Sequence, residues 1–249
     1  MTGRLGSTLP TLRKYKLVFL RNLITSLFLM LQYLESIDAQ LFMAINSAHC
    51  PYIDNFMWTV SNKYSCVLIA LALLYVLYLK GWKQMLVALG AVAIVVLLAD
   101  QVSSSIIKPM VERLRPSHDP ALAGMVHAVN GYVGGQFGFV SSHAANNFGV
   151  ALLVSLFLRN RWATISLMLW ALLVSYSRIY LGVHFPGDIL GGIVVGLGAG
   201  WLVYALWRWL QGKYDYGGPR RLFNACDAQV VAGSVLCNVL IIAIIAAFG

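Results

Sequence analysis

The sequence predicts an all-α fold, a polytopic membrane helix bundle of six to seven transmembrane helices that forms a single membrane domain over residues 1–249. Three observations support this prediction. Only 11% of the residues are charged and 59% are hydrophobic, whereas about 25% of the residues in a soluble globular protein are charged. The apolar residues fall in blocks near the roughly 20 residues that cross a bilayer as a helix. These blocks lack the alternation of apolar and polar residues that marks membrane β-strands.

Seven apolar blocks succeed one another along the chain, at residues 17–34, 65–79, 84–107, 144–158, 162–177, 187–209 and 229–248. Arg21 and Asn22 interrupt the first block, so a signal peptide, a membrane-surface helix and a true span are all open for it. Residues 35–38 offer no small-residue cleavage site, which argues against removal of this block. The last block is expected to be an additional C-terminal transmembrane helix.

The distribution of Lys and Arg predicts the orientation of the chain, because these residues in short loops are retained on the cytoplasmic side. If all seven blocks span, 13 of the 18 lie on the side of the amino terminus and 5 on the other. If the first block does not span, the bias becomes 8 against 10. We therefore expect a spanning first block, a cytoplasmic amino terminus and residues 36–64 outside. There Ile37, Leu41, Phe42 and Ile45 have the spacing of a helix lying at the interface.

The cysteine pattern gives no support for a metal site or a disulfide framework. The four cysteines, Cys50, Cys66, Cys226 and Cys237, form neither a CxxC pair nor a zinc-binding spacing. The net charge of +9 would suggest a nucleic-acid partner in a soluble protein. Here most of the positive residues fall in loops on one side of the membrane, so we expect membrane lipids and no nucleic acid as partners.

Three segments hold nearly all of the chemically capable residues, and each lies where an apolar block meets the outer side. They are residues 108–116 (KPMVERLRP), 139–147 (FVSSHAANN) and 177–188 (SRIYLGVHFPGD). Ionisable residues at membrane depth are costly and usually serve a function. The three segments therefore form the candidate functional site.

The positive residues of these segments form a candidate anion clamp. Lys108, Arg115 and Arg178 are cations, and guanidinium groups match phosphate oxygens in a bidentate way. Ser141 and Ser142 supply hydroxyl and N–H groups immediately before the fourth block, whose positive helix end would point at an anion. The three cations could take the place of metal ions, so we expect no metal and no cofactor.

Two histidines and one aspartate complete the set. Asp188 lies four residues after His184, near one helical turn, and could hold that imidazole in one tautomer. His143 offers a second group that can move protons. An anion clamp, a nucleophile with an orienting carboxylate and a second histidine as acid together indicate phosphoryl transfer.

The three segments closely resemble the motifs of the type-2 phosphatidic acid phosphatase superfamily, which also includes the vanadium haloperoxidases. Its pattern is KxxxxxxRP, then PSGH, then SRxxxxxHxxxD, and the first and third parts match completely. The second part matches at Ser141 and His143, while Val140 stands in place of proline and Ser142 in place of glycine. The resemblance covers roughly residues 36–209, the expected phosphatase core.

The resemblance implies a role for each residue of the set. His184 would attack phosphorus and form a phosphohistidine, with Asp188 orienting it. His143 would protonate the leaving oxygen and later activate water. The phosphoryl oxygens would be held by Lys108, Arg115, Ser141, Ser142 and Arg178. The implied enzyme is an integral membrane lipid phosphatase, a metal-independent hydrolase of phosphoric monoesters or acid anhydrides.

The implied substrates are lipid phosphates or diphosphates: undecaprenyl diphosphate, phosphatidylglycerophosphate, phosphatidic acid or a lipid A phosphate. The small size of the chain and its outward-facing site favour undecaprenyl diphosphate. The expected location is a bacterial inner membrane with the active site facing the periplasm, and the oligomeric state is left open. Two alternatives remain: a lipid phosphotransferase with the same site, and a non-enzymatic protein that binds or transports anionic lipid.

Several residues near the three segments receive no catalytic role. Arg113 matches no motif position and is expected to contact solvent or lipid headgroups. Asp100, inside the third block, is expected to bond to a neighbouring helix. The glycines of GYVGGQFGF are interpreted first as a flexible loop, and His118, Asp119 and His127 as ordinary loop residues.

Overall fold

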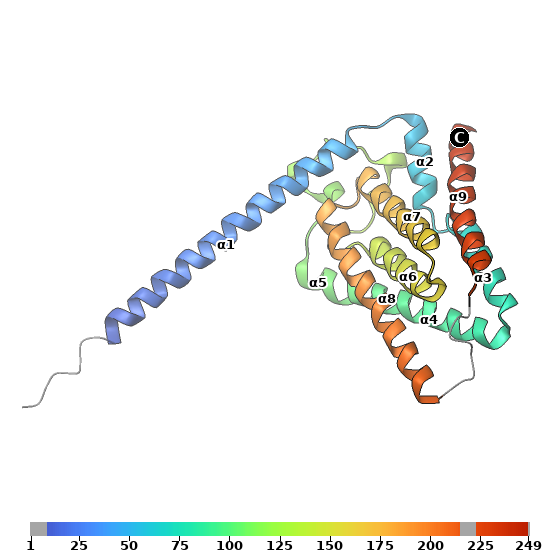
Figure 1. Cartoon of the computed structure of the whole chain (residues 1–249). Coiled ribbons are helices and arrows are strands. Elements are labelled where there is room, and N and C mark those ends of the chain that lie inside the picture. Colours follow the sequence, from blue (N-terminus) through green and yellow to red (C-terminus); the bar gives the residue numbers. More distant parts are fainter. Residues whose placement is uncertain (1–8, 215–222, 249) are drawn as a thin grey trace, which may run out of the picture. The chain divides into compact units, whose positions relative to one another are not determined.

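The computed structural model describes residues 9–214 and 223–248, and this part of the chain is helical (Figure 1). An isolated antiparallel bridge between Leu114 and Phe137 is the one strand-like pairing among these residues. The main helices are α1 (Leu9–Asn46), α2 (Pro51–Ser61), α3 (Val67–Leu79), α4 (Trp82–Asp100), α5 (Lys108–Val111), α6 (Ser142–Leu158), α7 (Arg161–Tyr180), α8 (Pro186–Tyr214) and α9 (Ala225–Phe248). The chain divides into two compact units, one ending at Leu41 and one beginning at Phe42.

The first unit consists of most of α1, which runs unbroken from Leu9 to Asn46. The helix predicted over residues 37–45 is present as the continuation of α1 and not as a separate element, and its place at the interface stays a prediction. The physical reason for the continuity is that no Gly or Pro occurs between Pro10 and Pro51, and these are the residues that break helices most strongly. Along residues 18–34 the large apolar side chains of this helix are exposed.

Four helical segments are long and apolar enough to cross a membrane: Trp82–Val111, Arg161–Tyr180, Pro186–Gln211 and Ala225–Phe248. Helices α3 and α6 are apolar but shorter, and α1 does not belong to this group within the described residues. The all-helical, membrane-protein character predicted from sequence is therefore confirmed. The number of six to seven spans, and a span at residues 17–34, stay predictions.

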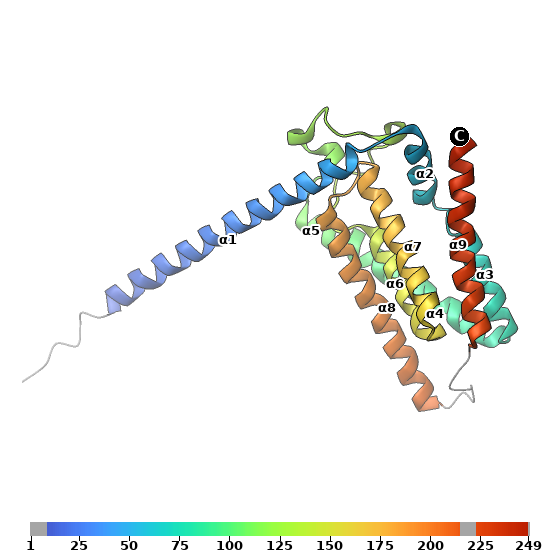
Figure 2. The ribbon, with the colours of Figure 1, turned by 45° about the horizontal axis from the view of Figure 1, so that its top comes forward.

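Short connections link neighbouring helices of the second unit. Lys80 and Gly81 join α3 to α4, and Arg159 and Asn160 join α6 to α7. The second link turns the chain back, so that α6 and α7 run in opposite directions (Figure 2). Asn160 also caps α7, since its side-chain oxygen accepts from Trp162 N at 2.9 Å and from the next amide.

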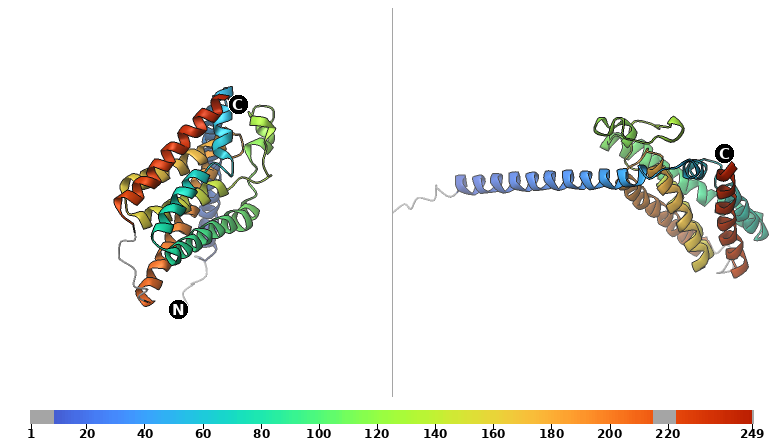
Figure 3. Two further views of the ribbon diagram at one scale, coloured as in Figure 1. Left: turned by 90° about the vertical axis from the view of Figure 1, so that its right-hand side faces the viewer. Right: turned by 90° about the horizontal axis from the view of Figure 1, so that it is seen from above.

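Helix α9 is part of the core of the second unit, because it packs against α2, α3 and α7 (Figure 3). Its apolar side chains share one buried cluster with residues of α3, α6 and α7. Two polar contacts tie it to the region of α3: Lys80 Nζ pairs with Asp227 Oδ2 at 2.5 Å, and Asn238 Nδ2 donates to Ser65 O at 2.8 Å. The last apolar block is thus integral to the helical bundle.

Helix α4 continues into a π-helical turn, η1 (Gln101–Ile107), and then into α5. Pro109 lacks an N–H, so the carbonyl four residues earlier loses its α-helical partner. In place of that pattern, the Lys108 N–H donates to Ser103 O, five residues back. Wide turns of this kind often occur at functional sites. Glu112, at φ 51°, then ends the helical run and turns the chain.

Helices α6 and α8 approach each other closely because α8 presents glycines four residues apart, Gly192, Gly196 and Gly200. A Cβ atom on Gly192 would lie 2.5 Å from the carbonyl oxygen of Ser141, and one on Gly196 would overlap the carbonyl oxygen of Ala145. Small residues allow this backbone-to-backbone contact in membrane helices. The glycines therefore bring the amino-terminal ends of the two helices together.

Replacement of Gly196 by alanine is expected to lower the unfolding temperature in detergent, because the added methyl group forces the helices apart. Overpacking of this kind costs about 1–3 kcal/mol. Gly198→Ala is the matched control, since nothing lies within 4 Å of a Cβ at that position. Thermal unfolding of the two variants, followed by size-exclusion chromatography, compares them directly. Equal unfolding temperatures would contradict the packing argument.

Candidate active site

The three motif segments meet at one end of the second unit, where α5 ends, α6 and α8 begin and α7 ends (Figure 2). The Ser141 N–H donates to the Asp188 carbonyl oxygen at 2.9 Å, which joins the second and third segments. The Arg115 N–H donates to Gln136 O at 3.0 Å, and Gly138 N–H donates to Arg113 O at 2.8 Å. These bonds draw the loop after the first segment back over the same site.

His184 and Asp188 form a buried pair. His184 Nδ1 and Asp188 Oδ2 lie 3.2 Å apart, and the side chains are 1% and 0% exposed. The Phe185 N–H donates to the same Oδ2 at 3.0 Å. Pro186 begins α8, which puts Asp188 in the first turn, where the positive end of the helix favours a carboxylate. The pair has the geometry in which a carboxylate fixes the tautomer of an imidazole.

The environment of His184 keeps its ring neutral. Burial lowers the pKa of His184 well below its usual range, and the charges of Arg115 and Arg178 act in the same direction. A lowered pKa means that protonation begins only at more acidic pH than for a histidine in water. At neutral pH the ring therefore retains a lone pair that can attack an electrophile.

Arg113 contacts the buried pair, contrary to the expectation of a solvent or headgroup contact. Its NH1 lies 3.0 Å from Asp188 Oδ1, and its guanidinium carbon is 4.3 Å from the centre of the Phe185 ring. The left-handed turn at Glu112 redirects the chain, so helical periodicity gave no signal for this contact. Sequence reasoning missed this contact of Arg113 with the buried pair.

Lys108 and Ser142 belong to a polar chain that crosses between helices. Lys108 Nζ donates to Ser142 Oγ at 2.8 Å, and Ser104 Oγ lies 2.9 Å from the same hydroxyl. Ser104 Oγ also donates to Asp100 Oδ1 at 3.3 Å. The partner of Asp100 is thus a residue of η1 in its own helical run, and not a neighbouring helix as expected from sequence.

Ser141 is fully buried as the N-cap residue of α6. Its Oγ accepts from the Ala144 N–H at 3.4 Å. The cap leaves the other amide groups at the start of α6 pointing toward the site, where the helix end favours an anion. Ser141 therefore fixes the position of the helix terminus at the site.

The two motif arginines carry buried N–H groups without a protein partner. Arg115 Nε donates to Phe137 O at 3.1 Å, but its NH1 has no hydrogen-bond partner. Arg178 donates from NH2 to the Tyr132 hydroxyl at 3.3 Å and from NH1 to Ser61 Oγ, whereas its Nε has no partner. Buried donors left unpaired are costly. Two guanidinium groups with spare donors are suited to an oxyanion.

The glycine-rich loop closes tightly over this cluster and is more than a flexible connection. A Cβ atom on Gly138 would lie 2.6 Å from Asp188 Oδ2, and one on Gly134 would overlap the Arg115 guanidinium. Gly134 also has φ +67°, which strains any other residue. Glycine at these positions lets the backbone pack directly on the charged groups.

His143 lies in the first turn of α6, next to the clamp. Its carbonyl oxygen accepts from Asn147 Nδ2 at 2.9 Å. The cationic groups of Arg178, Arg115 and Lys108 lie near enough to act electrostatically on its ring, so His143 shares the site with these cations. The structure thus brings together every site residue predicted from sequence.

A second polar cluster anchors the long outer loop. Asn46 accepts from His127 N at 2.8 Å and donates to the carbonyl oxygens of His127 and Tyr180. His127 Nε2 lies 3.0 Å from Asp54 Oδ2, and the Tyr180 hydroxyl donates to Asp54 Oδ1 at 2.6 Å. His127 is therefore an anchoring residue, whereas the sequence suggested an ordinary loop residue.

The donor atoms of His49, Asp54 and His127 lie within 4.8 Å of one another. The two imidazole rings are stacked 3.7 Å apart and are nearly parallel, at 6°. A metal ion lies in the plane of each imidazole that binds it, and parallel stacked rings cannot both meet this condition. The cluster fits a hydrogen-bonded anchor for the loop better than a metal site.

A family model for the PAP2 superfamily matches residues 83–211. The chain belongs to the PAP2 superfamily. The resemblance read from the three motifs is thus confirmed, and the chain is a membrane lipid phosphatase of a superfamily whose phosphatases need no metal ion.

Three similar proteins extend this assignment. The lipid A 4′-phosphatase of Bacteroides thetaiotaomicron is 43% identical over 193 residues, which cover 76% of this chain and 85% of that protein. The lipid A 4′-phosphatase of Porphyromonas gingivalis is 40% identical over 200 residues, 80% of this chain and 82% of that protein. The crystal structure of Aquifex aeolicus LpxE superposes with a TM-score of 0.54 at 25% identity, covering 67% of this chain and 94% of that one.

Replacement of Arg113 by alanine is expected to lower kcat about ten- to hundredfold, since a hydrogen bond to a charged group contributes roughly 1.5–3 kcal/mol. KM should change little if Arg113 acts through Asp188, to which its guanidinium is bonded. Arg113→Lys should recover part of the loss by restoring the charge. Arg161→Ala, which removes an exposed arginine at the start of α7, is the control. A loss confined to KM would contradict a positioning role.

Proposed function

We propose that this PAP2 phosphatase removes a phosphate from the sugar headgroup of lipid A, with His184 as the covalent nucleophile. The two relatives named as lipid A 4′-phosphatases match more than three quarters of the chain at 40% identity or above. This extent supports lipid A phosphate over undecaprenyl diphosphate, which the sequence alone favoured. The observation that carries the chemistry is the buried His184–Asp188 pair beside cations with unpartnered N–H groups.

In the first step, His184 attacks the phosphorus atom. The Nδ1–H donates to Asp188, which leaves the lone pair of Nε2 for the attack. The bond between phosphorus and the sugar oxygen breaks, and His143, whose protonated form the bound phosphoryl anion favours, donates its proton to that oxygen. Lys108, Arg115 and Arg178 hold the phosphoryl oxygens, whose negative charge they stabilise in the transition state.

In the second step, water hydrolyses the phosphohistidine. His143, now neutral, takes a proton from the water as its oxygen attacks phosphorus. The P–N bond breaks, inorganic phosphate leaves and His184 returns to its neutral form. Ser141 and Ser142 at the start of α6, with the positive helix end, hold the phosphoryl group through both steps.

The proposed site faces the periplasm of a bacterial inner membrane, with the amino terminus in the cytoplasm. The connections at the end of the second unit away from the site carry Lys80, Lys83, Arg159 and Arg161. Positive residues in short loops favour the cytoplasmic side, which supports an outward-facing site.

The test is phosphate release from a panel of lipids by the detergent-purified protein, with EDTA present throughout. The panel contains lipid A, phosphatidic acid, phosphatidylglycerophosphate and undecaprenyl diphosphate. We expect lipid A to have the highest kcat/KM, and His184→Ala to lower it by roughly 10³-fold or more on the scale of a lost nucleophile. His118→Ala, which removes a loop histidine outside the motifs, should retain activity.

Release that EDTA abolishes would exclude the metal-free mechanism. No release from any lipid by folded protein would favour the anionic-lipid binding alternative, and a phosphorylated lipid product would favour the phosphotransferase. His184→Asn accompanies His184→Ala in case the alanine variant does not fold.

A phosphohistidine should also be trapped directly. With substrate labelled in the phosphate, quenching the reaction with alkali should leave label on the wild-type protein, because phosphoramidates of histidine are stable in base and labile in acid. The His184→Asn variant should retain none. Equal labelling of both proteins would mean that another residue is the nucleophile.

A further inference from the structure

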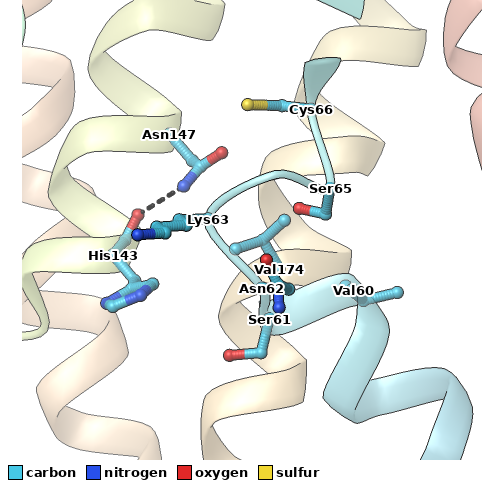
Figure 4. Close-up of a pocket in the computed structure, with 9 residues that line it drawn as sticks. All are labelled: Val60, Ser61, Asn62, Lys63, Ser65, Cys66, His143, Asn147 and Val174. Atoms are coloured by element: carbon cyan, nitrogen blue, oxygen red, sulfur yellow. Dashed lines mark hydrogen bonds between the residues drawn. The ribbon is translucent and has the colours of Figure 1, made fainter. Parts of the chain in front are cut away.

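A small polar hollow lies between the connection from α2 to α3 and the first turns of α6 (Figure 4). Its volume is about 90 Å³. Residues 61–63, 65 and 66 line one side, and His143 and Asn147 of α6 line the other. Figure 4 shows the Lys63 side chain extending from the connection toward His143 and Asn147. The hollow thus receives side chains from two elements far apart in sequence.

The hollow borders the reacting centre on the side of His143. His143 lines it, whereas His184 and Asp188 do not. Ser61, another lining residue, accepts a hydrogen bond from Arg178 of the phosphate clamp. Ser61 therefore belongs to the lining of the hollow and also contacts the phosphate clamp.

The direction of phosphoryl transfer relates this hollow to the leaving group. The attacking and leaving atoms lie on opposite faces of the phosphorus atom. If His184 attacks from one face, the bond that breaks points away from His184, toward the group that protonates the leaving oxygen. That group is His143, so the leaving group extends into the hollow that His143 lines.

Six of the nine residues that line the hollow have polar side chains: Ser61, Asn62, Lys63, Ser65, His143 and Asn147. Val60, Cys66 and Val174 add apolar surface to the lining. Asn62 uses Oδ1 to accept from Tyr64 N at 2.9 Å, and Asn147 uses Nδ2 to donate to His143 O. Their remaining amide atoms are one donor and one acceptor, which suit hydroxyl groups.

This lining discriminates between classes of leaving group. An acyl or prenyl chain in the hollow would leave the hydroxyls, amides and ammonium without partners, which is costly. A sugar ring offers hydroxyl groups at several edges and can pair with these atoms. The chemistry of the hollow therefore matches a carbohydrate.

We propose that the hollow is a binding subsite for the sugar that leaves with the oxygen, and that Lys63 binds a polar group of that sugar. This inference rests on the proposed lipid A phosphatase function and adds the residues that select the leaving group. The phosphoryl group is held by the motif cations, and the sugar is recognised by the connection between α2 and α3. The alcohol product occupies the hollow after accepting the proton of His143.

The test compares two substrates with different leaving groups, lipid A and phosphatidic acid, presented in the same mixed detergent micelles. Lys63→Met removes the ammonium and keeps an unbranched side chain of similar length. We expect kcat/KM for lipid A to fall about tenfold, mainly through KM, while the value for phosphatidic acid stays within about twofold. Lys83→Met is the matched control. It removes the same charge at the start of α4, at the end of the second unit away from the site.

The outcomes separate the two proposals. The sugar subsite is overturned if Lys63→Met loses activity to a similar extent on both substrates. It is also overturned if neither Lys63→Met nor the double variant with Ser65→Ala loses activity on lipid A. In both cases the lipid A activity itself stays in place. Hydrolysis of phosphatidic acid but not of lipid A by the wild-type protein overturns the proposed substrate itself, and the sugar subsite with it.

Discussion

The hydrogen bond from the Ser141 N–H to the Asp188 carbonyl oxygen joins the amino-terminal ends of α6 and α8 over 2.9 Å. It forms where Gly192 and Gly196 bring the two backbones so close that no Cβ would fit. The start of α6, with its serines and its positive end, is thereby fixed against the carboxylate bonded to His184. Without this contact the two motif segments would sit at the ends of helices packed at ordinary distance, and their side chains would not converge.

The negative charge of the site is paired within the protein, whereas the positive charges repel one another. Both oxygens of the buried Asp188 have partners, with Arg113 on one and His184 and the Phe185 amide on the other. Burial lowers the pKa of the Arg115 guanidinium, and the nearby charge of Arg178 adds to the effect. The carboxylate is therefore satisfied within the protein while the cations crowd one another. An anionic substrate relieves that repulsion, so the phosphoryl group itself supplies part of the binding energy.

Much of the site could be predicted from sequence because its residues recur at fixed spacings within single segments. Asp188 lies one helical turn from His184, and Lys108 and Arg115 frame one motif, so local patterns were sufficient. Arg113, Tyr132 and Ser61 could not be found in this way, because two of them lie in loops and Ser61 ends α2, and their meeting with the site depends on tertiary contacts.

For the fold too, features marked by local sequence patterns could be predicted, and the others could not. The apolar blocks indicated the core helices, since composition alone marks membrane helices. The continuity of α1 was missed because the change from apolar to mixed residues near residue 35 was interpreted as a boundary, although nothing there breaks a helix. The π-helical turn was missed because its hydrogen bonds depend on Pro109 and leave no periodicity in so short a stretch.

The π-helical turn η1 holds more residues than an α-helical path of the same length would need. Each residue of an α-helix rotates the chain by about 100°, so the wide turn sets the angular position of everything after it. Ser104 and Lys108 both reach Ser142 in the register that this turn sets. Residues 101–107 therefore determine the direction in which the side chains after them point. The packing face of α4 toward α6 and α8 can change by substitution, but inserting or deleting a residue before Lys108 would rotate the lysine away from Ser142.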